Sequence, residues 1–230
     1  MILFPDLLAK IARRLPKKNS LQQQLRAAGR TRWLDIGSIR FDPGFICADL
    51  HDPSEIPEDK SDRFIRLDLL GASPTELEAL GEFDLVRLQH VFEHFSPEDG
   101  LQVLKTLPAI MATDAYIVIT VPDLDAFVTA YRRGFARQER YRRFARKRVP
   151  EDAPSSFYFS VFAHQFGYLE GASPAKAHRW CYDHEGLVYQ LKRAGGYKNI
   201  RKLGMFHPLA EIPFTHNRPS QDACVIAQKA

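Results

Sequence analysis

Cysteine is scarce in this chain of 230 residues, which contains only three. Cys47, Cys181 and Cys224 are widely scattered and show no paired spacing. Neither a disulfide framework nor a cysteine-based zinc site is therefore indicated, and we expect a reducing compartment, the cytoplasm. The chain also lacks an internal repeat, and its length and apolar content of 45% favour one large domain.

The N-terminal segment lacks the uninterrupted apolar run of a signal or membrane-spanning sequence, because Asp6, Lys10 and Arg13 interrupt it. The spacing of its apolar residues predicts an amphipathic helical segment at 1–30, ahead of a main domain at 31–230. Two roles are open for this segment. It either caps the domain or contacts a membrane surface or a partner through residues 1–18.

Positive charge is unevenly distributed along the chain, whose formal net charge is only +4. Segment 131–149 carries eight arginines and Lys147 against one glutamate. Such a segment favours an anionic small-molecule or glycan partner, or it is a solvated helix whose aliphatic stems rest on the domain. Nucleic acid is disfavoured as a partner, because the sequence has no RNA-binding module signature.

Strand-like and helix-like segments alternate, which predicts an α/β fold with a largely parallel sheet. Helix starts are marked by Ser73-Pro74 with Glu76, and by Ser96-Pro97 with Asp99. The connection at 37–44 is too short for a normal crossover helix. The expected strands lie at 31–36, 45–48, 63–67, 83–89, 115–121, near 198–204 and at 222–228.

A basic and aromatic insertion at about 132–177 interrupts this alternation and predicts a lid. Its aromatic residues either stack on the faces of a sugar or pack as the lid's own core. These residues are Phe157, Tyr158, Phe159, Phe162, Phe166 and Tyr168.

The stretch His90-Val91-Phe92-Glu93-His94 fits the H-x-x-E-H pattern of zinc peptidases. That pattern requires both histidines on one face of a helix, yet His90 directly follows a strand and a new helix begins at Ser96-Pro97. No later segment supplies a convincing further ligand. We therefore expect no zinc peptidase and no metal site.

Polar residues follow the expected strands at their carboxyl ends, where ligands bind to an open parallel sheet. A glycine after the first strand lets a ligand approach the backbone, and an acid after the second can accept both hydroxyls of a ribose. Singly, each polar residue could be an ordinary cap or loop residue. The residues in question are Asp35, Gly37 and Ser38, then Asp49, Asp68, Gln89, His90 and Asp123.

Short motifs in a fixed order carry a resemblance to a known family. They are "WLDIGS", "PGFICADL", "FIRLDLL", "FDLVRLQHVFEHF", "YIVITVPDLDAF", "YDHEGLVYQLKRAGGYKNI" and "DACVIAQK". The sequence resembles the class I S-adenosylmethionine-dependent methyltransferases, especially bacterial predicted methyltransferases found with polysaccharide biosynthesis. The resemblance implies a Rossmann-like fold with a mostly parallel seven-stranded sheet, an antiparallel last strand and an inserted helical lid.

The resemblance also implies a role for each matching residue. Gln89 and His90 would face the cofactor and the acceptor pocket, and Glu93 with His94 would orient that turn. The cofactor would be S-adenosylmethionine. Its methionine part would lie along Asp35, Gly37 and Ser38. Its ribose would contact Asp49, and its adenine would contact Asp68 and Leu69.

The implied activity is a methyl transfer, and we expect O-methylation of a saccharide, nucleotide-sugar or related small molecule. A hydroxyl acceptor must lose its proton, a task that suits a histidine. The candidates are His90, His164 and His178, with Asp123 to assist.

One departure from the family stands at Ile39, where the family usually has a second glycine. A branched side chain there could crowd the cofactor, so a non-catalytic binding or scaffold protein is the alternative. A nicotinamide-dependent oxidoreductase is disfavoured, because Gly37 stands alone without a G-x-G-x-x-G run.

Overall fold

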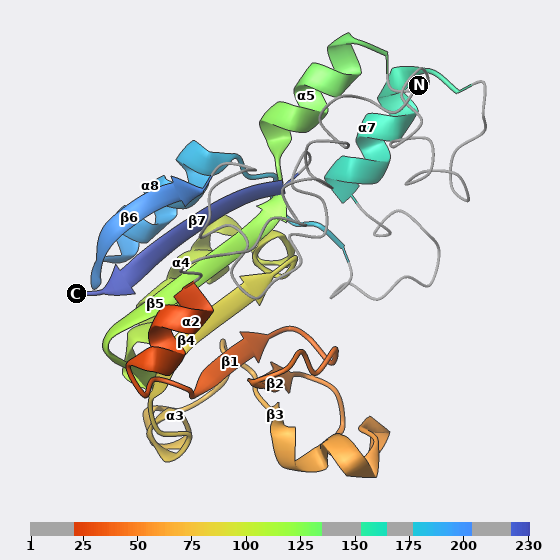
Figure 1. Cartoon of the computed structure of the whole chain (residues 1–230). Coiled ribbons are helices and arrows are strands. Elements are labelled where there is room, and N and C mark those ends of the chain that lie inside the picture. Colours follow the sequence, from red (N-terminus) through yellow and green to blue (C-terminus); the bar gives the residue numbers. More distant parts are fainter. Residues whose placement is uncertain (1–20, 135–152, 165–176, 204–221) are drawn as a thin grey trace.

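The computed structural model describes residues 21–134, 153–164, 177–203 and 222–230 (Figure 1). Its centre is a seven-stranded sheet with the order β3-β2-β1-β4-β5-β7-β6. Neighbouring strands pair in parallel except β7, which runs antiparallel to β5 and β6. The expected fold class is thereby confirmed. The strands are β1 (Trp33–Ile36), β2 (Phe45–Asp49), β3 (Phe64–Arg66), β4 (Phe83–Gln89), β5 (Met111–Pro122), β6 (Tyr197–Leu203) and β7 (Asp222–Lys229).

Helices cover both faces of the sheet (Figure 1). On β1, Leu34 and Ile36 face a core formed with α3, α4 and α8, whereas Trp33 faces Leu21 and Leu25 of α2. This alternation follows from the two-residue repeat of a strand. The α-helices are α2 (Leu21–Ala27), α3 (Pro74–Ala79), α4 (Pro97–Thr106), α5 (Leu124–Arg132), α7 (Ser155–His164) and α8 (His184–Ala194). The 3₁₀ helices are η1 (Pro53–Glu55), η2 (Glu58–Arg63), η3 (Phe92–His94) and η4 (Leu107–Ile110).

The helix starts expected from the sequence are confirmed. Ser73 and Glu76 form a complete capping box at α3, with the Ser73 hydroxyl accepting from the Glu76 N–H and the Glu76 carboxylate accepting from the Ser73 N–H. At α4, the Ser96 hydroxyl accepts from the Asp99 N–H. These local signals fix where α3 and α4 begin on the strand connections.

The short connection between β1 and β2 is held by two arginines in place of a crossover helix. Arg87 of β4 donates from Nη2 to Asp42 Oδ2 at 2.7 Å. Arg63 donates from Nη2 to the carbonyl oxygens of Asp42 at 2.7 Å and Phe45 at 2.9 Å. These bonds tie the side chain of Asp42 to β4, and tie the backbone of the connection near the start of β2 to Arg63.

The described part of the lid, α7, packs on α5 (Figure 1). Phe127 of α5 and Phe162 of α7 stack with their ring centroids 3.8 Å apart, and Tyr158 is 4% exposed. For Tyr158 and Phe162 this packing favours a lid core over sugar stacking, whereas Phe157 is 57% exposed.

Several sequence expectations lie outside the described residues. Among them are Phe166, Tyr168, segment 1–20 and most of the arginine-rich segment 131–149. The described end of the N-terminal segment, α2, buries Leu21 and Leu25 against the sheet. No helix within the described residues has the length and apolar character needed to cross a bilayer.

Candidate functional site

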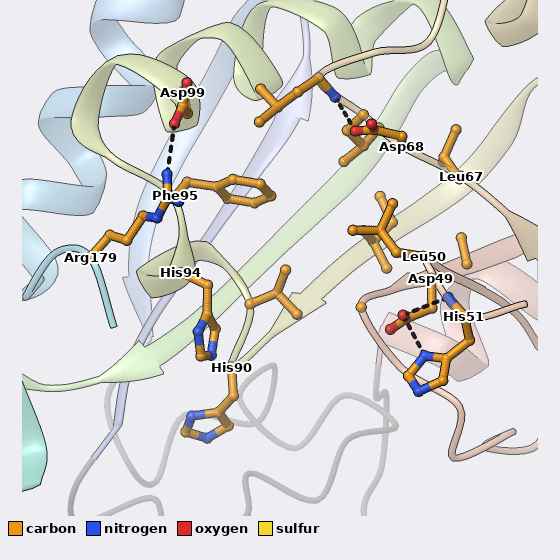
Figure 2. Close-up of a pocket in the computed structure, with 16 residues that line it drawn as sticks. Asp49, Leu50, His51, Leu67, Asp68, His90, His94, Phe95, Asp99 and Arg179 are labelled. Carbon is orange, nitrogen blue, oxygen red and sulfur yellow. Dashed lines mark hydrogen bonds and ion pairs between the residues drawn. The ribbon is translucent and has the colours of Figure 1, made fainter. Parts of the chain in front are cut away.

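A cavity of about 730 Å³ opens at the carboxyl ends of β1, β2, β3 and β4 (Figure 2). Its size suits a nucleotide-sized ligand, and its position is the one at which open parallel sheets bind ligands. It is lined by Ile36, Gly37, Ala48, Asp49, Leu50, His51, Leu67, Asp68, Leu69, Leu70, His90, Val91, His94, Phe95, Asp99 and Arg179.

Gly37 forms the floor of this cavity at the exit of β1. Its φ of +72° lies in the left-handed region, and its N–H donates to the Ala48 carbonyl oxygen at 2.6 Å. A Cβ at this position would stand 2.1 Å from Cγ2 of Val91, a distance that no side chain tolerates. Backbone angle and space therefore both require glycine here.

The exit of β2 places a carboxylate at the cavity wall. Asp49 Oδ1 accepts from the His51 backbone N–H at 3.2 Å and lies 2.6 Å from Nδ1 of the same residue (Figure 2). Both contacts use Oδ1 and orient the carboxylate. Such a fixed carboxylate at the end of a second strand is suited to a vicinal diol.

The exit of β3 combines a carboxylate with an apolar surface. Asp68 Oδ1 accepts from the Leu70 N–H at 3.0 Å, which turns the chain sharply after the strand (Figure 2). Leu67 and Leu69 are buried beside it. This end of the cavity therefore offers an aromatic base apolar contacts from Leu67 and Leu69 and a hydrogen-bonding group from Asp68.

The exit of β4 carries His90 in a strained backbone conformation, with φ at +55°. Its Nε2 lies 3.3 Å from Asp222 Oδ2, and its Nδ1 lies 3.4 Å from Glu93 Oε1. Burial acts to lower the pKa of His90, but the hydrogen bonds and charges of Asp222 and Glu93 outweigh it and raise the pKa to about 10. A protonated ring favours a donor role over that of a base at neutral pH.

Three residues expected at the cofactor do not line the cavity. Asp35 is fully buried and bonds Arg87 instead. The Ser38 hydroxyl accepts from the Arg40 N–H at 3.2 Å, and Gln89 is buried in β4. By contrast Gly37, Asp49, Asp68 and Leu69 do line it, and their contact with a cofactor stays a prediction.

The candidates for proton transfer lie in different places. Asp123 caps α5, accepting from the Asp125 N–H at 3.1 Å, and His164 is exposed at the end of α7. His178 has a buried side chain with its Nε2 3.9 Å from Glu93 Oε1, and burial lowers the pKa of the ring below its ordinary value. Glu93 thus lies between His90 and His178, whereas Asp123 and His164 lie outside the cavity lining.

Several lining residues were missed by the sequence reasoning. They are His51, Phe95, Asp99 and Arg179, of which Arg179 Nη1 lies 3.6 Å from Asp99 Oδ2 (Figure 2). Asp222 was missed beside His90. An antiparallel strand begins at the rim where its parallel neighbours end, so the position of Asp222 could have been anticipated from β7.

Ile39 does not narrow the cavity. Its side chain is 45% exposed, and it is not among the residues of the described chain that form the cavity wall. The effect of Ile39 on a bound cofactor, which motivated the non-catalytic alternative, stays a prediction.

Comparison with known proteins gives no family assignment, since no protein-family model and no curated protein matches the chain. Solved structures do match. "PigF with SAH" has a TM-score of 0.51 at 14% identity, covering 88% of this chain and 51% of that chain. The CurJ carbon methyltransferase has a TM-score of 0.50 at 15% identity, with 97% and 52% covered.

A third match is the S-adenosylmethionine-dependent methyltransferase SibL in its apo form, with a TM-score of 0.50 at 15% identity, covering 91% of this chain and 53% of that chain. The chain thus spans about half the length of these structures. At such identities the likeness shows the fold, which is the Rossmann-like fold of these methyltransferases.

Proposed function

We propose that this protein is an S-adenosylmethionine-dependent methyltransferase that acts on a hydroxyl group of a small molecule. The observation that carries the proposal is the cavity at the strand ends, where Gly37 lines the wall at the exit of β1 and Asp49 presents a fixed carboxylate. The structural likeness to methyltransferases supports the same conclusion at the level of the fold.

The residues present fit the cofactor from one end of the cavity to the other. Gly37 suits the methionine part, Asp49 the two ribose hydroxyls, and Asp68 with Leu69 the adenine. When bound, the cofactor supplies a methyl group on a positively charged sulfur, which makes that methyl electrophilic without further activation. The protein then has to hold an acceptor in line with it and keep water out.

The acceptor side of the cavity is formed by His90, His94 and Arg179. The half-exposed guanidinium of Arg179 suits an anionic acceptor, and Trp180, 49% exposed, offers an aromatic face nearby in the chain. These features support a saccharide, a nucleotide-sugar or a related molecule as the acceptor. In this proposal, Asp123 and His164 do not contact the acceptor.

A transfer assay tests this proposal. The full-length protein is incubated with methyl-tritiated S-adenosylmethionine and sets of free sugars, nucleotide sugars and phenols, with amines of similar size as the comparison. We expect label to appear in a hydroxyl-bearing acceptor, and at a greater rate for anionic than for neutral ones. Binding of the cofactor without labelled product from any acceptor would argue against methyl transfer to a hydroxyl.

A further inference from the structure

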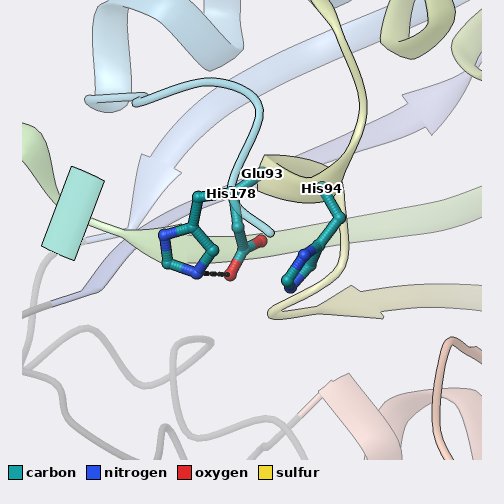
Figure 3. A group of neighbouring side chains, drawn as sticks. All are labelled: Glu93, His94 and His178. Atoms are coloured by element: carbon teal, nitrogen blue, oxygen red, sulfur yellow. Dashed lines mark ion pairs between the residues drawn. The ribbon is translucent and has the colours of Figure 1, made fainter. Parts of the chain in front are cut away.

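Glu93, His94 and His178 form a compact group beside the cavity (Figure 3). One potential ligand atom from each residue lies within 4.8 Å of the other two. Glu93 and His94 belong to η3, directly after β4, whereas His178 comes from the segment before α8. The N–H groups of Arg179 and Trp180 donate to the Glu93 carbonyl oxygen at 2.9 and 3.2 Å, which fixes the two segments together.

The carboxylate of Glu93 is buried, and its contacts with the neighbouring histidines His90 and His178 are long. Its side chain is 3% exposed, and neither oxygen accepts a hydrogen bond of normal geometry from the residues that the structure describes. The approaching groups, His90 Nδ1 at 3.4 Å and His178 Nε2 at 3.9 Å, are longer than hydrogen bonds of ordinary strength. Two buried carboxylates, Glu93 and Asp222, face the single ring of His90, so a further cation at Glu93 would stabilise this buried negative charge.

Both histidines are held in the tautomer that a metal ion requires. His94 Nδ1 lies 3.0 Å from the Ala177 carbonyl oxygen, and His178 Nδ1 lies 2.7 Å from the Phe162 carbonyl oxygen. Because a carbonyl oxygen only accepts, each Nδ1 carries a proton and donates it. In the neutral form, a ring bonded in this way keeps its lone pair on Nε2, and such backbone bonding of the second nitrogen is typical of histidines that bind metals.

We propose that Glu93, His94 and His178 bind a divalent transition-metal ion through one carboxylate oxygen and two Nε2 atoms. Two imidazoles with one carboxylate favour ions from Mn²⁺ to Zn²⁺ over Mg²⁺ and Ca²⁺, which prefer oxygen ligands. Ligands of a tetrahedral zinc ion are about 3.4 Å apart, so ligand atoms that lie up to 4.8 Å apart would have to approach one another by up to about 1.4 Å. The proposal replaces the sequence expectation that there is no metal site.

On this proposal, the H-x-x-E-H pattern contributes two ligands, Glu93 and His94, but its two histidines do not bind the ion together. His90 and His94 cannot act together, because His90 ends β4 and its nitrogens face Asp222 and Glu93. The third ligand comes instead from His178, 84 residues after His94 in the numbering. Only the fold brings it to Glu93.

The location of the ion gives it a role that rests on the proposed function. His94 lines the cavity as well as the metal group, so an ion there would face the acceptor side. Three protein ligands leave at least one coordination position open, as in catalytic metal sites. An acceptor hydroxyl in that position would be held in place, and it would lose its proton to bulk solvent more easily as it binds, before the site closes on the cofactor.

Cobalt titration tests the site without relying on activity. The full-length protein, carrying no histidine tag, is treated with a chelator, desalted and titrated with Co²⁺ by calorimetry and visible absorption. We expect one Co²⁺ per chain and the d–d absorption of a nitrogen and oxygen site. Glu93→Gln and His178→Ala should each weaken binding about tenfold or more, while His164→Ala, an exposed histidine outside the group, should not change it.

Either of two results would overturn the site. One is the absence of Co²⁺ binding to the wild-type protein up to millimolar concentration, and the other is equal affinity in all three variants. Binding of S-adenosylhomocysteine, measured on the same samples, keeps the two proposals apart. Cobalt binding without S-adenosylhomocysteine binding would leave the metal site standing and remove the methyltransferase function.

Discussion

Arg87 and Asp35 face each other across the adjacent strands β4 and β1, and the guanidinium bonds the carboxylate through both Nε and Nη2. Both side chains are buried, and Arg87 also lies over the ring of Phe45 with Cζ 4.4 Å from its centroid. Together with the bond from Arg87 to Asp42, this pair ties the short β1–β2 connection to the middle of the sheet.

Removing one partner of this pair should destabilise the protein strongly. Asp35→Ala leaves a buried guanidinium without its main counter-charge, and we expect the free energy of unfolding to fall by about 3–5 kcal/mol. The double variant Asp35→Leu/Arg87→Met should lose less than the sum of the single variants, since it removes both charges. Urea unfolding measures this, and a loss below about 1 kcal/mol in Asp35→Ala would show the pair to be unimportant.

Glycine at position 37 should be required for binding of the cofactor. Gly37→Ala adds a Cβ that would stand 2.1 Å from Val91 Cγ2, at the floor of the cavity. The expected result is a loss of affinity for S-adenosylhomocysteine of tenfold or more, measured by calorimetry. A matched control is Gly195→Ala, because Gly195 has a similar φ of +70° with nothing within 4 Å of the added atom.

Gly195→Ala should cost about 1–3 kcal/mol of stability from backbone strain, because φ of 70° with ψ of 179° is a conformation largely restricted to glycine, and it should leave the affinity unchanged. If Gly37→Ala behaved like Gly195→Ala in both measurements, the floor of the cavity would not be where a ligand approaches the backbone.

Asp123 should act as a cap whose charge is unfavourable in the folded state. Burial raises the pKa of its carboxyl. At neutral pH the ionised carboxylate is therefore less favourable in the folded protein than in the unfolded chain. Asp123→Asn keeps the cap and removes the charge, so the variant should be at least as stable as wild type at pH 7. Asp123→Ala removes the cap and should cost about 1 kcal/mol.

The sign of the pH effect follows from the raised pKa. Wild type should recover stability relative to Asp123→Asn as the pH falls through the folded pKa of Asp123, and the recovery should be complete below about 3.9, the ordinary value for aspartate. Denaturant unfolding at a series of pH values measures the difference. A gap between the two proteins that widens on acidification would mean that the folded state favours the charged carboxyl.

Much of the fold could be predicted from the sequence because its signals are local. The apolar run from Ala115 marks a buried strand, and Ser73 and Ser96 with their prolines mark helix starts. Residues directly after the strands, such as Gly37 and Asp49, were found because parallel strands end at one rim. A residue that directly follows a parallel strand lies at the rim where the cavity opens, so its place could be predicted from the sequence.

The remainder depends on pairings between distant residues. Asp35 was expected at the cofactor, but alternation along β1 turns it toward the α2 face, where Arg87 stands directly opposite in the register. The contact between Glu93 and His178 was also not predicted, because the two residues are far apart in the sequence. Neither pairing has a local signature, because each depends on the sheet order and on the segment that precedes α8.

The central claim is that the cavity binds S-adenosylmethionine, and calorimetric titration with S-adenosylhomocysteine tests it most directly. Asp49→Ala removes the carboxylate at the β2 exit, and Asp62→Ala is the matched control, because Asp62 is an exposed acid of η2 outside the cavity lining. The account predicts micromolar binding to wild type and Asp62→Ala, with a loss of tenfold or more in Asp49→Ala. Absence of binding to wild type, or equal binding in all three proteins, would contradict it.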